Sequence, residues 1–354
     1  MQAALPPSLE TDQWVYGRHP SGTVGIEHYE RRRTSVSTDL AAGEVIVAAR
    51  YISVDPYMRI NQSQKPTYNP APHPLGAVQS AGVVGQVLHS ASPLFAIDDW
   101  VEGSLGWQTL AKTHATALRK LDPDAAPPST ALGVLGMPGR TAWFGLTESG
   151  KPRAGEVVVV SGAAGAVGSL VVQFAMRHGC RVIGVAGGPS KCRWLTETLG
   201  LDAAIDYRAH ATADSLQDAI RAHALGVDVY FDNVGGMVTD AVVPLINRRA
   251  RIVVCGQISQ YDGGLDMPTL GPRFLHHVLY QRATIQGMLA RDYLHRMDEM
   301  AAIVGPWVKS GHIVFEETIV DGFDQLPATL NRLFTGEHIG KLLVRVDFKT
   351  GETP

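Results

Sequence analysis

Cysteine is scarce in this sequence, and the cysteines present do not form the groupings that bind metals or build disulfides. The 354 residues include only Cys180, Cys192 and Cys255. None belongs to a C-x-x-C pair, and none is accompanied by histidines at the spacing of a zinc site. The sequence therefore predicts no metal site and no disulfide framework. Reduced thiols are typical of the cytoplasm, which is the location we expect.

Charged residues are also few. They make up 18% of the chain, with a net charge of −3, and the basic cluster Arg31–Arg33 is too short to indicate nucleic acid. The start MQAALPPSLETDQW lacks the basic segment and apolar run of a secretory signal. The uncharged run Val157–Met176 has the length of a membrane span, but Ser161-Gly162 and the following glycines divide it into a strand and a helix. We expect neither a nucleic-acid nor a membrane partner.

Apolar residues make up 45% of the chain, enough for large cores and about two domains. The first part carries short apolar runs, EVIVAARYISV and AGVVGQVLHS, between frequent turn residues, which is typical of a small antiparallel barrel. Strand-like material returns near the end in HIVFEETIV and KLLVRVDF. We predict one domain from residues 1–135 plus 312–354 and a second from residues 136–311.

Strands and helices alternate in the second domain. This pattern predicts a parallel sheet with right-handed crossovers, an α/β fold. The predicted strands are 156–160, 181–186, 227–232 and 251–256, and the predicted helices are 166–178, 190–200 and 236–246.

The turn after the first of these strands reads SGAAGAVGS, with Gly162, Gly165 and Gly168 spaced three apart. Glycines at the start of a helix let backbone amides approach a pyrophosphate. They also permit tight packing of a helix on a strand. The strand–loop–helix context favours nucleotide binding.

The end of the second strand indicates which nucleotide is bound. An Asp or Glu there would bind the ribose hydroxyls of NAD and repel a 2′-phosphate. This chain has VIGVAGGPSK instead, with glycines at that place followed by Lys191, and Tyr207 stands after the segment AAID. We infer NADP(H), although Lys191 taken alone fits a solvated lysine in the first turn of a helix.

Several strings resemble the medium-chain dehydrogenase/reductase superfamily, in particular its zinc-free branch of prostaglandin reductases, plant double-bond reductases and bacterial curcumin reductases. They are VDPYMR, GMPGRTAWFGL, AAGAVGS, FDNVGG, CGQISQY and HIGKLLVRV. The resemblance implies a doubly wound Rossmann sheet inserted in a GroES-like β-barrel catalytic domain. It also implies NADP(H) as cofactor, no metal and a homodimer.

The same resemblance implies which residues line the cofactor. They are Gly165, Ala166, Val167, Gly168, Lys191, Tyr207, Asn233, Cys255, Gly256, Gln257, Ile258, Ser259, Tyr261, Gly287, Met288, Leu289 and His338. His338 departs from the asparagine that the family usually carries in this string. Leu105 and Gly106 stand where prostaglandin-type members have aromatics, so a different substrate pocket is expected.

Two tyrosines are the candidate catalytic residues. Hydride delivery to an enone places negative charge on the carbonyl oxygen and requires a proton for the α-carbon. Tyr261 is expected to polarise the carbonyl or relay the proton, and Tyr57 to hold the substrate. Solvent or the cofactor ribose are alternative proton sources, and a core tyrosine is the structural alternative for both.

The predicted activity is NADPH-dependent reduction of the carbon–carbon double bond of α,β-unsaturated ketones or aldehydes. A quinone reductase would share the fold and the metal-free site. A non-catalytic NADP-binding protein is a third possibility, because a fold alone does not establish an activity.

Overall fold

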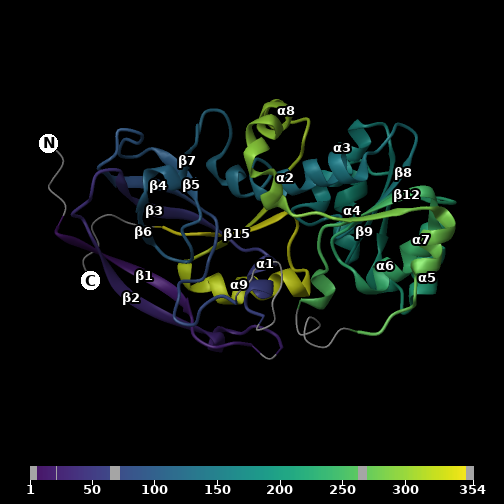
Figure 1. The fold of residues 1–354 in the computed structure, drawn as a ribbon, viewed down its shortest axis with the longest axis horizontal. Helices are drawn as coiled ribbons and strands as arrows, with labels where there is room; N and C mark the ends of the chain where they lie inside the picture. The colour runs from purple at the N-terminus through teal and green to yellow at the C-terminus, as the bar shows by residue number, and fades with distance from the viewer. Residues whose placement is uncertain (1–5, 21, 64–71, 262–268, 348–354) are drawn as a thin grey trace. The chain divides into compact units, whose positions relative to one another are not determined.

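The computed structural model describes residues 6–20, 22–63, 72–261 and 269–347 (Figure 1). The chain divides into two compact units. Unit one comprises Met1–Leu132, Thr318–Glu337 and Leu342–Pro354, and unit two comprises Gly133–Glu317 and His338–Lys341. These divisions fall a few residues from the predicted boundaries, and they place His338–Lys341 with unit two. The catalytic and cofactor roles assigned to the two domains stay predictions.

Unit one is built on a seven-stranded sheet of order β14-β15-β3-β4-β5-β7, with β6 also paired to β3. The last strand, β15, pairs antiparallel with β3, with Leu343 opposite Ser53, so the end of the chain rejoins the first sheet as predicted. The strands are β3 (Glu44–Ser53), β4 (Val83–Ser90), β5 (Trp100–Gly103), β6 (Leu110–His114), β7 (Leu118–Lys120), β14 (Glu317–Asp321) and β15 (Lys341–Arg345). A ribbon of β1 (Ser8–Tyr16) and β2 (Tyr29–Ser37), with helices α1 (Tyr57–Asn61) and α9 (Leu326–Thr335), completes the described part.

Unit two holds a six-stranded sheet of order β10-β9-β8-β11-β12-β13, with parallel pairings throughout. Numbered within the unit, this is the order 3-2-1-4-5-6 of a doubly wound Rossmann fold, so the predicted fold class is confirmed. The strands are β8 (Val157–Ser161), β9 (Arg181–Ala186), β10 (Ala203–Asp206), β11 (Val227–Asp232), β12 (Ile246–Val254) and β13 (Thr284–Gly287).

Three observed elements of unit two differ by several residues from the predicted bounds. The helix predicted over 190–200 is α-helical only to Arg193 and continues as a π-helix over Trp194–Thr198. The strand predicted over 251–256 is β12, which begins at Ile246 and ends at Val254. Helix α6 ends at Val242, and a 3-10 turn over Val243–Leu245 leads into β12, so the helix predicted to residue 246 is too long. Pro244 has no N–H to donate, which ends the α-helical ladder there. The helices are α2 (Met137–Phe144), α3 (Gly168–Arg177), α4 (Pro189–Arg193), α5 (Ala213–Arg221), α6 (Gly236–Val242), α7 (Leu275–Gln281) and α8 (Met297–Lys309).

The central strand β8 explains the long apolar run in the sequence. Val158, Val159 and Val160 are fully buried, because a parallel strand with helices on both faces has no solvated side. Leu170 and Val171 of α3 are also buried, and Leu170 packs in the cluster that contains Val158. No helix in the described ranges is long and apolar enough to cross a membrane.

Candidate cofactor-binding site

The glycine loop connects β8 to α3 at the carboxyl edge of the sheet. Gly162 has a φ of 60°, which favours glycine. A Cβ at Gly168 would lie 2.2 Å from the Gly162 carbonyl oxygen, so no side chain fits there. The glycine pattern therefore has the packing role considered as an alternative. It also leaves the start of α3 bare, as a pyrophosphate requires.

The amino end of α3 is suited to an anion. Its N-cap residue is Val167, and no side chain among the described residues caps the first turn. The first turn of a helix carries its positive dipole end. The Ser169 and Leu170 N–H groups already donate to the Gly165 and Val167 carbonyls at 3.0 and 3.1 Å, so the amides that precede them would meet an anion. The arrangement therefore fits the pyrophosphate of a dinucleotide.

A pair of cations lies at the end of β9, where an acidic residue would select NAD. Burial lowers the pKa of Lys191, and the nearby positive charge of Arg208 lowers it further. A Cβ at Gly187 would lie 2.9 Å from Tyr207 Cε1 and 3.0 Å from Arg208 Nε, so both side chains pass close to that glycine. Two cations and a phenol thus meet here.

Arg208 is a residue that the sequence reasoning missed. It follows Tyr207 directly in AIDYRA, and this adjacency is the signal that could have found it. The carboxylate of Asp206, two residues before Arg208, is engaged by backbone N–H groups. Its Oδ1 accepts hydrogen bonds from the N–H groups of Gly188 at 2.8 Å and Arg208 at 3.0 Å. The carboxylate therefore ties the turn after β9 to the turn after β10.

A buried carboxylate joins the ends of β8 and β11, the central pair of strands. Asp232 is 1% exposed, and its oxygens accept five hydrogen bonds. The donors are Ser161 Oγ (2.9 Å), Tyr230 OH (2.9 Å), Val234 N (3.0 Å), Gly235 N (2.9 Å) and Thr239 Oγ1 (2.6 Å). Asp232 therefore shapes the turn at the point where doubly wound folds bind ligands.

Asn233 is fixed beside this carboxylate. Its backbone N–H donates to Ser161 Oγ at 2.8 Å, and its Nδ2 donates to the Ser161 carbonyl at 2.7 Å. Both bonds tie the start of the β11–α6 loop to the end of β8. These bonds orient the Asn233 side chain. Its predicted contact with the cofactor stays a prediction.

The loop over residues 255–261 rests on the same turn. The Cys255 N–H donates to the Asp232 carbonyl at 2.8 Å, and Ser259 Oγ donates to the Val234 carbonyl at 2.6 Å. Burial raises the pKa of the Cys255 thiol to about 12, which suits a small packed side chain more than a nucleophile. The predicted cofactor residues Gly256, Gln257 and Ile258 lie in this loop.

Tyr261 closes this loop through its own hydroxyl. The Gln257 N–H donates to the Tyr261 oxygen at 2.8 Å. Burial raises the pKa of Tyr261, and the Gln257 amide acts in the opposite direction. A phenol that accepts a bond from an amide keeps its proton for donation to another group. The residues after Tyr261, 262–268, lie outside the described ranges.

The segment Gly287–Leu289 follows β13, the edge strand. The Met288 N–H donates to the Val254 carbonyl at 3.0 Å, and its side chain is buried. Leu289 is 38% exposed. Their predicted position beside the nicotinamide stays a prediction.

His338 belongs to a segment, His338–Lys341, that contacts the glycine loop through Gly340. Two residues later, the Gly340 N–H donates to the Ala164 carbonyl at 2.8 Å. The predicted contact of His338 with the cofactor stays a prediction.

The predicted substrate residues of unit one have local explanations. Tyr57 is the first residue of α1 and is partly buried. Gly106 has a φ of 78°, and a Cβ there would lie 2.9 Å from the Gln79 carbonyl oxygen. A tight turn therefore requires glycine at residue 106, whatever the pocket holds. The joint action of Tyr57 and Tyr261 on one substrate stays a prediction.

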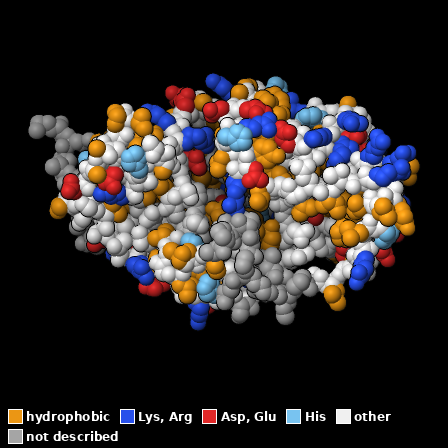
Figure 2. All heavy atoms as spheres, viewed as in Figure 1, with side chains coloured by type: hydrophobic (Ala, Val, Ile, Leu, Met, Phe, Trp, Pro, Cys, Tyr) orange, Lys and Arg blue, Asp and Glu red, His pale blue; other side chains and the backbone are white. Residues whose placement is uncertain are grey.

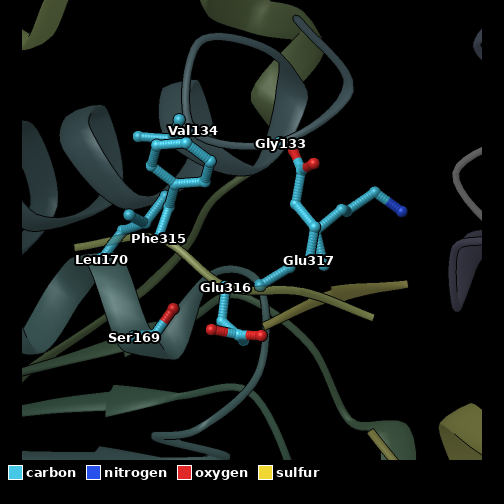
Figure 3. A pocket seen from close by; sticks show the side chains of 9 residues that line it. Gly133, Val134, Ser169, Leu170, Phe315, Glu316 and Glu317 are labelled. Carbon is cyan, nitrogen blue, oxygen red and sulfur yellow. The ribbon is translucent and has the colours of Figure 1, made fainter. Parts of the chain in front are cut away.

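A small cavity of about 10 Å³ lies behind the first turn of α3 (Figure 3). In this view the Phe315 ring lies beside Val134, and Glu316 lies across from Ser169. The volume suits about one water molecule and excludes a nicotinamide ring. The cavity is therefore a packing feature behind the glycine loop. Separately, no cluster of three or more His, Cys, Asp or Glu within the described ranges is placed to hold a metal ion.

Comparison with known proteins places the chain in a family. A model described as the N-terminal domain of oxidoreductase matches residues 12–121, and one described as zinc-binding dehydrogenase matches residues 166–304. The NADPH-dependent curcumin reductase of Escherichia coli is 41% identical over 337 residues, covering 94% of this chain and 96% of the relative. The NADP(+)-dependent 2-alkenal reductase of Nicotiana tabacum is 37% identical over 347 residues, covering 97% and 99%.

A solved structure agrees with the sequence relatives. The crystal structure of CurA in complex with NADPH from Vibrio vulnificus has a TM-score of 0.87 and 37% identity, covering 96% of this chain and 100% of that chain. The relatives match nearly the whole chain, and the sheet has the Rossmann order. The chain therefore belongs to the medium-chain dehydrogenase/reductase superfamily, in its branch of NADPH-dependent double-bond reductases.

Proposed function

We propose that this chain reduces the carbon–carbon double bond of α,β-unsaturated ketones or aldehydes with NADPH. The observation that carries the proposal is the cation pair Lys191 and Arg208 at the end of β9, where the sequence has glycines and no acid. A 2′-phosphate is recognised by cations and repelled by a carboxylate at this position. The E. coli and tobacco relatives, named for NADP(H)-dependent curcumin and 2-alkenal reduction, support the choice of substrate class.

We infer that residues of unit two hold the cofactor along its length. Lys191, Tyr207 and Arg208 would hold the 2′-phosphate, and the amides at the start of α3 would hold the pyrophosphate. The loops after β11 and β12, fastened by Asp232, would line the nicotinamide half. When bound, NADPH supplies the hydride that reaches the β-carbon of the alkene.

Tyr261 is suited to the developing enolate. Because burial raises its pKa, the phenol keeps its proton at neutral pH. Because the Gln257 amide already donates to its oxygen, the hydroxyl proton is directed to another acceptor. We infer that the Tyr261 hydroxyl donates a hydrogen bond to the substrate oxygen, which is the role of a donor in an oxyanion hole. Tyr57 would hold the substrate.

The experiment is a steady-state comparison of NADPH oxidation with a short enal, a benzylidene ketone, a keto-lipid and a quinone. Turnover of the alkenes with product saturated at the α,β bond supports the proposal. Turnover of the quinone alone would assign a quinone reductase, and tight NADPH binding without turnover would assign a binding protein.

Tyr261→Phe tests the residue assignment in the same assay. We expect kcat to fall on the order of a hundredfold, the scale of one lost oxyanion donor. Tyr293→Phe is the matched control, because the Tyr293 ring stacks on Phe144 at 4.7 Å and Phe keeps that stacking. Unchanged turnover of Tyr261→Phe would remove this tyrosine from the chemistry.

We also propose that the reaction needs no metal, that the chain acts in the cytoplasm and that it forms a homodimer. The metal-free reaction is consistent with a phenol that donates a hydrogen bond to the enolate oxygen in place of a Lewis acid. The cytoplasmic location is consistent with the three free thiols. Unaltered kcat after dialysis against a chelator, with metal analysis, tests the first. Fractionation of cells with an antibody against the chain tests the second.

The dimer proposal rests on one surface of unit two. Strand β13 is an edge strand, and all four of its residues are exposed. On α7, which packs against the neighbouring strand β12, Leu275 is 69%, Leu279 70% and Tyr280 70% exposed, and hydrophobic side chains gather on this face (Figure 2). An open sheet edge with apolar neighbours favours pairing with another chain. We infer that a second copy covers it.

A further inference from the structure

A short tail segment, His338–Lys341, reaches the glycine loop from the far end of the sequence. We call it the strap. It groups with unit two, although Thr318–Glu337 before it and Leu342–Pro354 after it group with unit one. Gly340 forms a parallel bridge with Gly165, and its N–H donates to the Ala164 carbonyl at 2.8 Å.

The strap clamps one peptide of the loop. The carbonyl of the Ala164–Gly165 peptide accepts the bond from Gly340, and its N–H donates to the Gly162 carbonyl at 3.0 Å. A trans peptide is planar, so a hydrogen bond at each edge fixes the orientation of the whole unit. The next residues, Ala166 and Val167, lead directly into α3. The direction of the first helical amides therefore depends on this peptide.

Gly340 is required by the geometry of the strap. Its φ is 66°, and a Cβ there would lie 1.9 Å from the Glu316 carbonyl oxygen. The neighbouring Lys341 N–H donates to that same oxygen at 2.8 Å. The strap is thus held between the chain at Glu316 and the loop at Ala164.

Packing behind the loop is close. The cavity of about 10 Å³ is lined by Ala166 and Ser169 from the helix side and by Glu316 and Lys341 from the tail side (Figure 3). Ser169 and Lys341 are 2% and 4% exposed. A tail that fills the space to within about one water molecule leaves the loop little freedom to turn.

We propose that Gly340 is a positioning residue for the cofactor: through Ala164 it holds the glycine loop in the conformation that presents the α3 amides to the pyrophosphate. This inference rests on the proposed placement of NADPH at that loop. The strap would then contribute to the affinity for the whole dinucleotide by orientation alone, because ordering a loop before binding removes part of the cost of binding.

The test compares two ligands in two variants. Gly340→Ala is expected to raise the Kd for NADPH on the order of tenfold, with the Kd for adenosine 2′-monophosphate changed less than about twofold, since that ligand lacks the pyrophosphate. Gly336→Ala is the matched control, because Gly336 ends α9 with a φ of 72° and carries a similar backbone penalty in the same tail. It should lower Tm without the selective loss of NADPH. An equal loss of both ligands, or an unchanged NADPH Kd in folded Gly340→Ala, overturns the proposal.

A second measurement uses the wild-type protein, in case Gly340→Ala does not fold. Hydrogen exchange of peptides covering 164–169 and 338–341 is followed with NADPH and with adenosine 2′-monophosphate. The inference expects NADPH to protect both segments together and the nucleotide monophosphate to protect neither. Protection of 164–169 alone would refute the role of the strap and leave the proposed cofactor site standing. Absence of protection in both would refute the proposed site as well.

Discussion

Removal of the Lys191 side chain should reduce the preference of the cofactor site for NADPH over NADH. A charge-assisted hydrogen bond to a phosphate contributes about 1.5–3 kcal/mol, so Lys191→Ala should raise the Kd for NADPH roughly 10- to 150-fold. The Kd for NADH, which lacks the 2′-phosphate, should change less than about twofold. Because Lys191 is only partly buried on a short helix, the free energy of unfolding should change by less than about 0.5 kcal/mol.

The pH dependence of binding gives the same hypothesis a second readout. In the free protein, burial and then Arg208 lower the pKa of Lys191, and a bound phosphate dianion would raise it again. The charged form is therefore lost at a lower pH in the free protein than in the complex. The affinity for NADPH should fall as the pH rises through the alkaline range, and this fall should be absent in Lys191→Ala.

Fluorescence titration with both nucleotides, from neutral to alkaline pH, measures these effects. Arg193→Ala is the matched control, since Arg193 is an exposed cation on the same helix. Arg208→Ala should resemble Lys191→Ala, and the double variant should lose less than the sum of the two because both cations act on one phosphate. If NADH binding weakened as much as NADPH binding, or if Arg193→Ala had the same effect, the electrostatic explanation of selectivity would be wrong.

Three further predictions concern folding and assembly. Asp232→Ala should lower the free energy of unfolding, measured by urea titration, by about 3 kcal/mol or more, because several buried donors lose their acceptor. A loss below about 1 kcal/mol would contradict this. Gly168→Ala should lower Tm, because a Cβ at Gly168 would lie 2.2 Å from the Gly162 carbonyl oxygen. An unchanged Tm would refute the packing argument. Leu279→Glu should shift the mass measured by light scattering from dimer to monomer, and a persistent dimer would place the interface elsewhere.

The sequence by itself determined the features that depend on near neighbours in the chain. The alternation of short apolar strands with helices predicted the parallel sheet, and β9 and β11 have the predicted bounds. The missing acid after β9 was readable because it follows that strand directly. Such patterns are local: the period of two or 3.6 residues and the residue types of one turn are written in consecutive positions.

Only the tertiary structure decided which distant segments meet. Arg208 follows β10 yet lies near Lys191 after β9, because adjacent parallel strands bring their carboxyl ends together. Gly340 holds Ala164 from about half the chain away, and Ser161 donates to Asp232 from 71 residues away. Apart from the adjacency of Arg208 to Tyr207, no local pattern marks these contacts. A hydrogen bond or a Coulomb interaction depends on distance in space, and the packing of the whole sheet sets that distance.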